Sequence, residues 1–308
     1  MRLSMYPQNL PKILAIVAPT ASGKSALAMR LARMLGAEIF SIDSLSVYRE
    51  IDIASAKPTR QELSEITHYG INALSPDEHC SAAVFMELFT QALKQCSKEI
   101  LLIVGGSGFY LTCLYEGLSP MPEIGGLIKD SIAKQIQSLS SPYEFLRSID
   151  PASADSISSS DTYRIHKLLA IYFSTSTAPS VYFSSHARAA LIPEPQIYSI
   201  AMPREQLIAR IEQRTQDMLD HGLIDEARTL LERYGRAIQP FSAIGLKECL
   251  EYFDSSIDKR ALQEQIAIHT RQLAKRQATY IRSKFPATIS APSDNLYEII
   301  MHEHGRGL

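Results

Sequence analysis

The sequence predicts an α/β protein in which a parallel sheet is flanked by helices. Three apolar runs typical of buried strands, 13–17, 100–104 and 196–201, alternate with segments of helical periodicity. A phosphate-binding pattern directly follows the first run, in the strand–loop–helix context that such a loop requires. Open parallel sheets bind ligands at the carboxyl ends of their strands, so we expect the functional residues to gather there.

The composition is that of a globular protein with a sizeable core. The chain has 308 residues, of which 45% are hydrophobic, and a formal net charge of −2. This charge argues against a generally basic surface, so any nucleic-acid-binding surface must be a local patch.

The sequence gives no sign of membrane insertion or of a disulfide framework. No apolar run approaches the ~18 residues of a membrane span, and residues 1–12 lack the apolar core of a signal peptide. No C-x-x-C pair occurs, so we expect reduced thiols rather than a zinc site or disulfides at Cys80, Cys96, Cys113 and Cys249. We therefore expect a cytoplasmic protein without membrane contact, acting as a monomer.

The phosphate-binding loop follows the first strand and leads into a helix over 26–35. It consists of Ala18, Pro19, Thr20, Ala21, Ser22, Gly23, Lys24 and Ser25. Its backbone N–H groups and the helix N-terminus suit a phosphate, Lys24 adds a positive charge, and the Ser25 hydroxyl can ligate Mg²⁺. Ala18 stands where the usual pattern has Gly, which narrows the backbone conformations allowed there. The loop makes the predicted fold P-loop NTPase-like without identifying the phosphorylated ligand.

Polar residues follow two further strands. The second strand, 37–42, leads to Asp43. Its carboxylate can either support Mg²⁺ by contacting the ligands of the ion or act as a general base. The irregular segment after it, 45–58, is interpreted as a loop of the site. The strand 100–104 leads into a glycine-rich turn, where Ser107 either contacts a ligand or only closes a tight connection.

Beyond a helix over 81–94, the character of the chain changes near Gly117. Proline and glycine between 120 and 126 indicate a linker, and the Ser-rich segment that follows is predicted to be a helical insertion. Its clearest helix runs over 161–172, with Asp161 as the N-cap. We therefore divide the chain into the first part of the P-loop core, the helical insertion, and the completion of the core with C-terminal helices, at 1–118, 119–190 and 191–308.

The C-terminal part reads as a strand over 196–201 and helices over 204–222, 223–234 and 258–285, with a short peripheral end after Pro286. In the first of these helices, Arg210 and Arg214 share a face, and surface pairing with nearby acidic residues is the plainer interpretation.

The last long helix is basic on one side. Between Arg271 and Lys284 it has five basic residues and no acidic one. At ~100° per residue, Arg271, Lys275 and Arg282 share one face, roughly opposite the apolar positions Leu262, Ile266, Leu273 and Tyr280. RNA phosphates would suit this face, and a solvated basic face is the alternative.

These segments together resemble the bacterial tRNA dimethylallyltransferase (tRNA isopentenyltransferase) family. The resemblance rests on Pro19–Ser25, Asp43–Ser44, Val47–Tyr48, Asp52–Ile53, Ala56–Pro58, Gly105–Tyr110, Glu116–Pro120, Ala243–Gly245 and Thr270–Gln277. It spans residues 13 to about 285, and the segments around Lys57 and Lys275 are its most specific parts. Family members transfer a dimethylallyl group from dimethylallyl diphosphate to the exocyclic N6 amine of the adenosine 3′-adjacent to the anticodon in tRNA.

The resemblance implies a catalytic role for Asp43, Ser107, Lys24 and Arg214. Asp43 would be the base, and Arg214 would bind the diphosphate together with residues 18–25, with Mg²⁺ as cofactor at Ser25. The partners implied are dimethylallyl diphosphate and the tRNA anticodon stem-loop. The implied RNA contacts are Asp43, Ser44, Leu45, Ser46, Ser107, Lys129, Tyr163, Arg164, Ile165, His166, Lys167, Ser242, Ala243, Ile244, Gly245, Leu246, Lys247, Lys275, Arg276, Gln277, Ala278, Thr279, Tyr280, Ile281 and Arg282.

The sequence departs from the family pattern at several positions. Ser107 replaces a usual Thr, the Ala54–Ser55 pair replaces Gly-Thr, and Phe109 takes a usual Leu or Met position. Three alternatives to the tRNA-modifying enzyme stay open: a prenyltransferase acting on free adenine nucleotides, a P-loop kinase, and a non-catalytic RNA-binding protein.

Overall fold

The computed structural model describes residues 10–186 and 188–305, with only the backbone of Leu127. The chain divides into two compact units. One takes in the chain up to Tyr115 and from Leu191 onward, and the other spans Glu116–Ala190, the segment expected as a helical insertion. Within the described part of the chain, no helix has the length and apolar character needed to cross a membrane.

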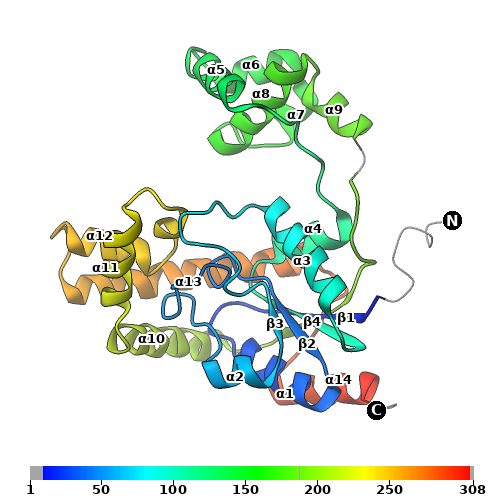
Figure 1. The fold of residues 1–308 in the computed structure, drawn as a ribbon, viewed down its shortest axis with the longest axis vertical. Coiled ribbons are helices and arrows are strands. Elements are labelled where there is room, and N and C mark those ends of the chain that lie inside the picture. Colours follow the sequence, from blue (N-terminus) through cyan, green and yellow to red (C-terminus); the bar gives the residue numbers. More distant parts are fainter. Residues whose placement is uncertain (1–9, 187, 306–308) are drawn as a thin grey trace. The chain divides into compact units, whose positions relative to one another are not determined.

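A six-stranded parallel sheet forms the middle of the first unit, in the order β3-β2-β4-β1-β5-β6 (Figure 1). The strands are β1 (Lys12–Val17), β2 (Glu38–Ser41), β3 (His68–Tyr69), β4 (Ile100–Gly105), β5 (Gln196–Ile200) and β6 (Ile289–Ala291). Val17 pairs with Gly105, so the phosphate-binding loop and the glycine-rich turn leave the sheet side by side. The predicted parallel sheet flanked by helices is confirmed.

Both faces of the sheet are covered, because alternate residues of β1 pack into different cores. Leu14 and Ile16 belong to the core formed with α1 (Lys24–Leu35) and α14 (Ser293–His304). Ala15 and Val17 belong to the core that includes residues of α3 (Ala82–Gln95), α4 (Gly108–Glu116) and α13 (Lys259–Lys284). The phosphate-binding loop therefore leaves a strand that is fixed from both sides.

The chain after Pro286 is not peripheral, contrary to the sequence-based prediction. It forms β6 at the edge of the sheet and then α14, which packs against α1. Leu296 and Ile300 of α14 are 0% and 1% exposed. The prediction was wrong because β6 has only three residues, too few for an alternating pattern to be recognised. The sequence also did not predict the two-residue strand β3 or the helix α2 (Arg60–Glu65), because both are too short to show a pattern of apolar residues.

The other C-terminal helices gather at one side of the sheet, and α13 runs from this group back to it (Figure 1). They are α10 (Arg204–Asp220), α11 (Leu223–Tyr234), the 3₁₀ turn η1 (Gln239–Ser242) and α12 (Leu246–Phe253). The helix α13 packs against both α10 and α12, with Leu262 and Ile266 buried as the apolar pattern predicts. These contacts place α13 beside the phosphate-binding loop.

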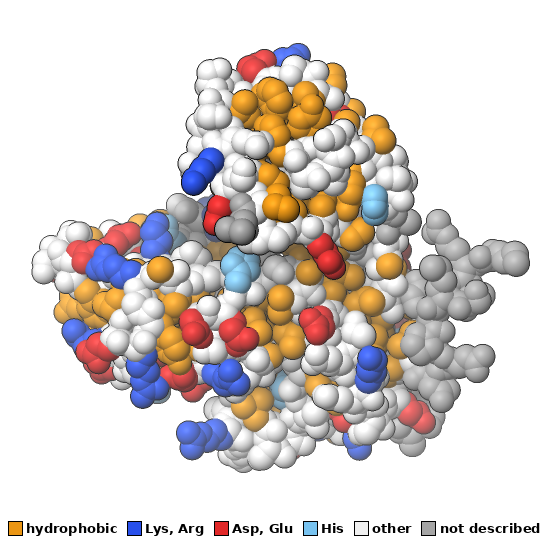
Figure 2. All heavy atoms as spheres, turned by 45° about the horizontal axis from the view of Figure 1, so that its top comes forward, with side chains coloured by type: hydrophobic (Ala, Val, Ile, Leu, Met, Phe, Trp, Pro, Cys, Tyr) orange, Lys and Arg blue, Asp and Glu red, His pale blue; other side chains and the backbone are white. Residues whose placement is uncertain are grey.

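The second unit is a small helical bundle with its own core. Its helices are α5 (Gly126–Gln137), α6 (Pro142–Ile149), α7 (Pro151–Asp155), α8 (Thr162–Thr175) and α9 (Pro179–Ser185). Asp161 caps α8, as predicted, by accepting a hydrogen bond from the Arg164 N–H. Asp150 joins α7 to α9, because its carboxylate accepts hydrogen bonds from the backbone and the hydroxyl groups of both Ser153 and Ser180. Figure 2 shows apolar side chains exposed over this unit, in the upper part of the view.

Candidate active site

The phosphate-binding loop joins β1 to α1 and is fixed by the neighbouring strand. Ala18 is fully buried, and its N–H donates a hydrogen bond to the Gly105 carbonyl at 3.3 Å. The left-handed backbone positions of the loop are Ala21, with φ 62°, and Gly23, with φ 92°. Ala18 is not among the left-handed residues, so its replacement of the usual glycine is accommodated. Any backbone strain falls instead on Ala21, because left-handed conformations disfavour a Cβ.

Two arginines of α10 contact this loop directly. Arg214 Nη1 donates a hydrogen bond to Thr20 Oγ1 at 3.2 Å, and Arg210 Nη1 donates to the Ser22 carbonyl at 3.1 Å. The plainer interpretation, surface pairing with acidic neighbours, is wrong for this pair. Glu212 is instead paired with Arg271, and Asp217 accepts from Gln213.

A cavity of about 270 Å³ opens beside the loop. Its lining brings together residues from four parts of the sequence: Thr20, Lys24 and Ser25 of the loop and α1, Asp43 and Ser46 after β2, Lys57, and Arg214 of α10. Three cations, Lys24, Lys57 and Arg214, therefore line the cavity together with two carboxylates, Asp43 and Glu62. This charge balance favours a ligand with several negative charges, such as a diphosphate.

The crowded cations alter the proton affinity of Lys24. The pKa of Lys24 is lowered from 10.5 to about 8, chiefly by burial of its ammonium group and also by the neighbouring Arg214. The carboxylate of Asp43 acts the opposite way by favouring the charged form. Burial also lowers the pKa of Arg214. A bound diphosphate would reverse this shift in Lys24, because it supplies the missing negative charge.

Asp43 is held in place by one of its two carboxylate oxygens. Oδ1 accepts hydrogen bonds from the N–H groups of Leu45, at 2.8 Å, and Ser46, at 3.1 Å. Within residues 10–186 and 188–305, no hydrogen bond reaches Oδ2. The local turn thus orients the carboxylate and leaves one oxygen available to a substrate proton.

The segment after Tyr48 closes over the same cavity and depends on two charged residues. Lys57 has only 3% of its side chain exposed; its ammonium group donates hydrogen bonds to the Tyr48 carbonyl, at 2.6 Å, and to Asp52, at 2.8 Å. Glu226 of α11 accepts hydrogen bonds from three consecutive backbone N–H groups, those of residues 52, 53 and 54, at 2.7, 2.7 and 2.9 Å. Sequence reasoning missed Glu226, because nothing in the regular helix around it distinguishes it from a solvated surface carboxylate.

The glycine-rich turn is shaped by close contacts with its neighbours. A Cβ on Gly105 would lie 2.5 Å from the Ile42 side chain, and one on Gly106 would lie 2.2 Å from Gln277 Nε2. The Gln277 side chain, on α13, also accepts a hydrogen bond from the Thr20 N–H at 2.9 Å. Gln277 therefore joins the turn to the phosphate-binding loop. Ser107 lies in the same turn but does not line the cavity of about 270 Å³ beside the phosphate-binding loop.

The implied RNA contacts of the first unit divide into exposed and buried groups. On α13, Lys275, Arg276, Ala278, Thr279 and Arg282 are exposed, whereas Ile281 is buried. Ser242, at the end of η1, and Lys247, at the start of α12, are exposed, whereas Leu246 is buried. Glu248 fixes the turn that leads into α12, since its carboxylate accepts one hydrogen bond from the Gly245 N–H and contacts His269 Nδ1, both at 2.6 Å.

The implied RNA contacts of the second unit lie on α5 and α8. Lys129 is exposed near the start of α5. On α8, Tyr163, Arg164, His166 and Lys167 are exposed, whereas Ile165 belongs to the core of the unit. The Lys167 ammonium lies 5.7 Å from the centre of the Tyr163 ring. An exposed aromatic ring among cations suits stacking on unpaired bases and contact with phosphates.

A magnesium ion would find few protein ligands here. Among the described residues, no group of three or more His, Cys, Asp or Glu side chains could hold a metal ion. The Ser25 hydroxyl and the Asp43 carboxylate line the same cavity, and both are oxygen donors of the kind that Mg²⁺ prefers. The site therefore fits a Mg²⁺ ion that takes most of its ligands from a bound diphosphate and water.

Comparison with known proteins identifies the family of this chain. The family model described as IPP transferase matches residues 46–284. The chain is 47% identical over 290 residues to the tRNA dimethylallyltransferase of Nautilia profundicola, covering 94% of this chain and 99% of the relative. It is 45% identical to one from Helicobacter pylori, covering 89% and 88%. A solved tRNA Δ²-isopentenylpyrophosphate transferase from Staphylococcus epidermidis aligns with TM-score 0.67 and 30% identity, covering 96% of this chain and 100% of that one. The chain therefore belongs to the IPP transferase family.

Proposed function

We propose that the protein transfers a dimethylallyl group from dimethylallyl diphosphate to the exocyclic N6 amine of the adenosine 3′-adjacent to the anticodon in tRNA, releasing diphosphate. The observation that carries the proposal is the cavity of about 270 Å³ beside the phosphate-binding loop, which we call the catalytic cavity. Lys24, Arg214 and Asp43 all line it, and Arg214 also contacts Thr20 of the loop. The names of the relatives support the same reaction.

The proposed reaction exchanges one bond of the prenyl carbon for another. The bond from this carbon to the bridging diphosphate oxygen breaks, and its electron pair stays on the diphosphate. The lone pair of the adenosine amine forms the new C–N bond, and the amine proton passes to Asp43 Oδ2. Lys24, Arg214 and the loop N–H groups stabilise the charge that develops on the leaving diphosphate. Mg²⁺, held at Ser25, would add positive charge at the same oxygens.

Gln277 and Ser107 occupy different places in this scheme. The Gln277 side chain accepts a hydrogen bond from the Thr20 N–H and thereby positions the loop that would bind the diphosphate. Ser107 stands at the same end of the sheet, in the turn after β4, outside the lining of the catalytic cavity. We assign Ser107 a contact with the RNA or its target base rather than with the diphosphate.

An RNA substrate is favoured over a free nucleotide by the exposed cations of two helices. On α13 these are Lys275, Arg276 and Arg282, and on α8 they accompany the exposed Tyr163 ring. Phosphate contacts of this kind would give a strong salt dependence, and the target base would have to leave its stack to reach the cavity. We place this reaction in the cytoplasm, with the protein acting as a monomer.

Two measurements test the proposal. The first incubates the protein with dimethylallyl diphosphate and Mg²⁺ and with an anticodon stem-loop, AMP or ATP as acceptor, and follows the product mass. We expect the mass of the stem-loop alone to increase by one dimethylallyl group. An increase on AMP or ATP alone would instead identify a prenyltransferase acting on free adenine nucleotides. The second uses Asp43→Asn, for which turnover should fall at least a hundredfold while stem-loop binding persists. Undiminished turnover would remove Asp43 from the mechanism.

A further inference from the structure

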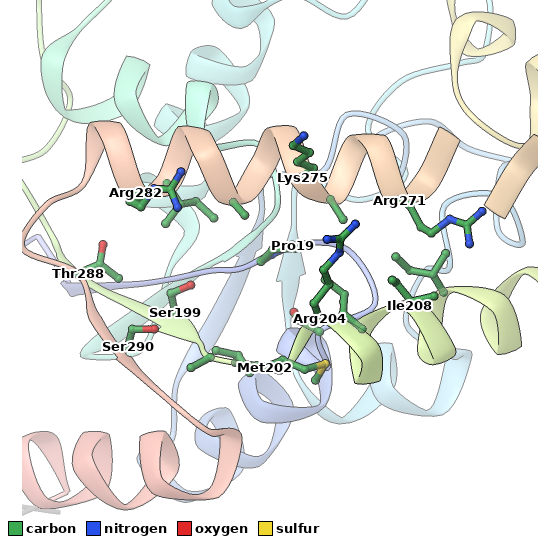
Figure 3. A pocket seen from close by; sticks show the side chains of 18 of the residues that line it. Pro19, Ser199, Met202, Arg204, Ile208, Arg271, Lys275, Arg282, Thr288 and Ser290 are labelled. Atoms are coloured by element: carbon green, nitrogen blue, oxygen red, sulfur yellow. The ribbon is translucent and has the colours of Figure 1, made fainter. Parts of the chain in front are cut away.

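A second, larger cavity borders the phosphate-binding loop. It has a volume of about 940 Å³ and is bounded by α10, α13 and the ends of β5 and β6 (Figure 3). Pro19 and Ser22 of the loop line this cavity, whereas Thr20 and Lys24 line the catalytic one. The loop is therefore a wall shared by two cavities. The larger one lies within the range of roughly 300–1,000 Å³ typical of small-molecule sites. The proposed chemical step does not use it, although Lys275 and Arg282, proposed above as RNA contacts, belong to its lining.

The larger cavity is positively charged. Arg204, Arg271, Lys275 and Arg282 line it, and no Asp or Glu of residues 10–186 and 188–305 does. Arg271 is paired with Glu212 at 3.1 Å, but among the described residues none of the other three cations has an ion-pair partner. Figure 3 shows the Arg204 side chain extending from α10 toward α13, where Lys275 and Arg271 lie. This arrangement favours an anionic ligand that reaches from one helix to the other.

The remaining lining combines apolar side chains with hydroxyl groups. Met202 and Ile208 contribute apolar surface, while the side chains of Ser199, Thr288 and Ser290 lie close together on one side of the cavity (Figure 3). Ser22 adds a buried hydroxyl that has no hydrogen-bond partner among the described residues. The Thr288 hydroxyl already donates a hydrogen bond to the Phe285 carbonyl. An aliphatic ligand would leave the Ser22 hydroxyl without a partner at a free-energy cost, whereas the edge of a nucleobase offers donors and acceptors.

We propose that this cavity binds a purine nucleotide, with the base against the hydroxyl-lined side and the phosphates beside Arg204. The cavity and its charge do not depend on the proposed prenyl transfer. Because the nucleotide would contact Pro19 and Ser22, its binding changes the affinity of the opposite side of the loop for diphosphate. Thermodynamic linkage requires that the diphosphate change the affinity for the nucleotide by the same factor.

The test measures binding of N-methylanthraniloyl-ADP to the full-length protein by fluorescence. ADP should displace the probe, while inorganic diphosphate and geranyl diphosphate should do so at least tenfold less effectively. Arg204→Glu reverses a cation of the cavity, and Ile208→Trp fills part of its volume. Each should weaken probe binding at least tenfold. Lys259→Glu makes the same charge change on an exposed position outside the cavity and should leave binding unchanged.

Measurements on two variants distinguish this site from the catalytic cavity. The Lys24→Ala variant should lose affinity for dimethylallyl diphosphate but bind N-methylanthraniloyl-ADP with unchanged affinity. Arg204→Glu should retain prenyl transfer in the absence of nucleotide, and circular dichroism establishes that each variant is folded. Absence of probe binding, or binding that Lys24→Ala abolishes and Arg204→Glu leaves intact, would overturn the proposal. Displacement by geranyl diphosphate more readily than by ADP would overturn it as well.

Discussion

The Oε1 atom of Gln277 accepts a hydrogen bond from the backbone N–H of Thr20 at 2.9 Å, joining the last long helix to the phosphate-binding loop. In loops of this kind the N–H groups are free to bind phosphate oxygens. Here one of them is already occupied by a side chain from α13. The position of the loop therefore depends on α13.

Replacing Gln277 with alanine should loosen the phosphate-binding loop. The variant leaves the partly buried Thr20 N–H without its acceptor, which costs about 1 kcal/mol. We expect the KM for dimethylallyl diphosphate to rise about fivefold, as steady-state kinetics at saturating RNA would measure. Gln272→Ala, an exposed glutamine of the same helix, should leave this KM unchanged. A changed KM for RNA with an unchanged KM for the diphosphate would make Gln277 an RNA contact only.

Gly106→Ala should reproduce the Gln277→Ala defect. A Cβ at this position would lie 2.2 Å from Gln277 Nε2 and so must displace the glutamine from its contact with the loop. We expect the double variant Gly106→Ala, Gln277→Ala to be little worse than either single variant in the KM for dimethylallyl diphosphate. Additive effects of the two substitutions would show that Gly106 acts independently.

The lowered pKa of Lys24 predicts how ligand binding and stability change with pH. Diphosphate binds the charged ammonium, so the KM for dimethylallyl diphosphate should rise above pH about 8, approaching tenfold per pH unit. Without ligand, the unfolded chain holds this proton up to about 10.5 and the native protein only up to about 8. The free energy of unfolding should therefore increase with pH across that window.

Urea denaturation at pH 7 and pH 9 tests the predicted increase in the free energy of unfolding. Wild type should gain ~1 kcal/mol over this interval relative to Lys24→Met, which has no titrating group at this position. An equal pH dependence in the two proteins would contradict the lowered pKa.

Glu226→Ala should release the segment that covers the catalytic cavity. Three N–H groups, those of Asp52, Ile53 and Ala54, lose their shared carboxylate acceptor, and we expect a loss of about 2 kcal/mol in the free energy of unfolding. The displaced segment also carries Lys57, so kcat/KM should fall roughly tenfold. The matched control is Glu232→Ala, an exposed carboxylate on the same helix, for which both quantities should stay at wild-type values.

Asp150 makes the second unit sensitive to acid. Burial alone raises the pKa of Asp150, but the hydrogen bonds from Ser153 and Ser180 outweigh it, and the net pKa is lowered. For a carboxyl group with a lowered pKa, the stabilisation is present at neutral pH and is lost as the pH falls below about 4. Asp150→Asn should therefore lower the urea midpoint at pH 7, and the difference from wild type should shrink toward pH 3. A constant difference across this range would assign the effect to packing alone.

Sequence reasoning located Lys24 and Asp43 because both follow strands with clear apolar patterns, and parallel strands bring their ends together. It also identified Arg214, but only through the family resemblance, since its spacing from Arg210 was equally compatible with surface pairing. It did not predict the bond between Gln277 and Thr20 or the role of Glu226. Both contacts join residues far apart in the chain, and their helices show no local irregularity that would reveal them. The strand β6 was missed because edge strands of three residues carry almost no pattern.

The contact between Thr20 and Gln277 has a consequence for the order in which the protein matures. The two residues are 257 positions apart, so a ribosome working at roughly 5–20 residues per second makes Gln277 about 13 to 51 s after Thr20. During that interval the nascent loop lacks its bond to α13, and the strand β6 that closes one edge of the sheet has not yet been synthesised. Chains released before α13 would therefore carry a complete phosphate-binding loop that cannot take up its final position. The loop would reach that position only late in biosynthesis.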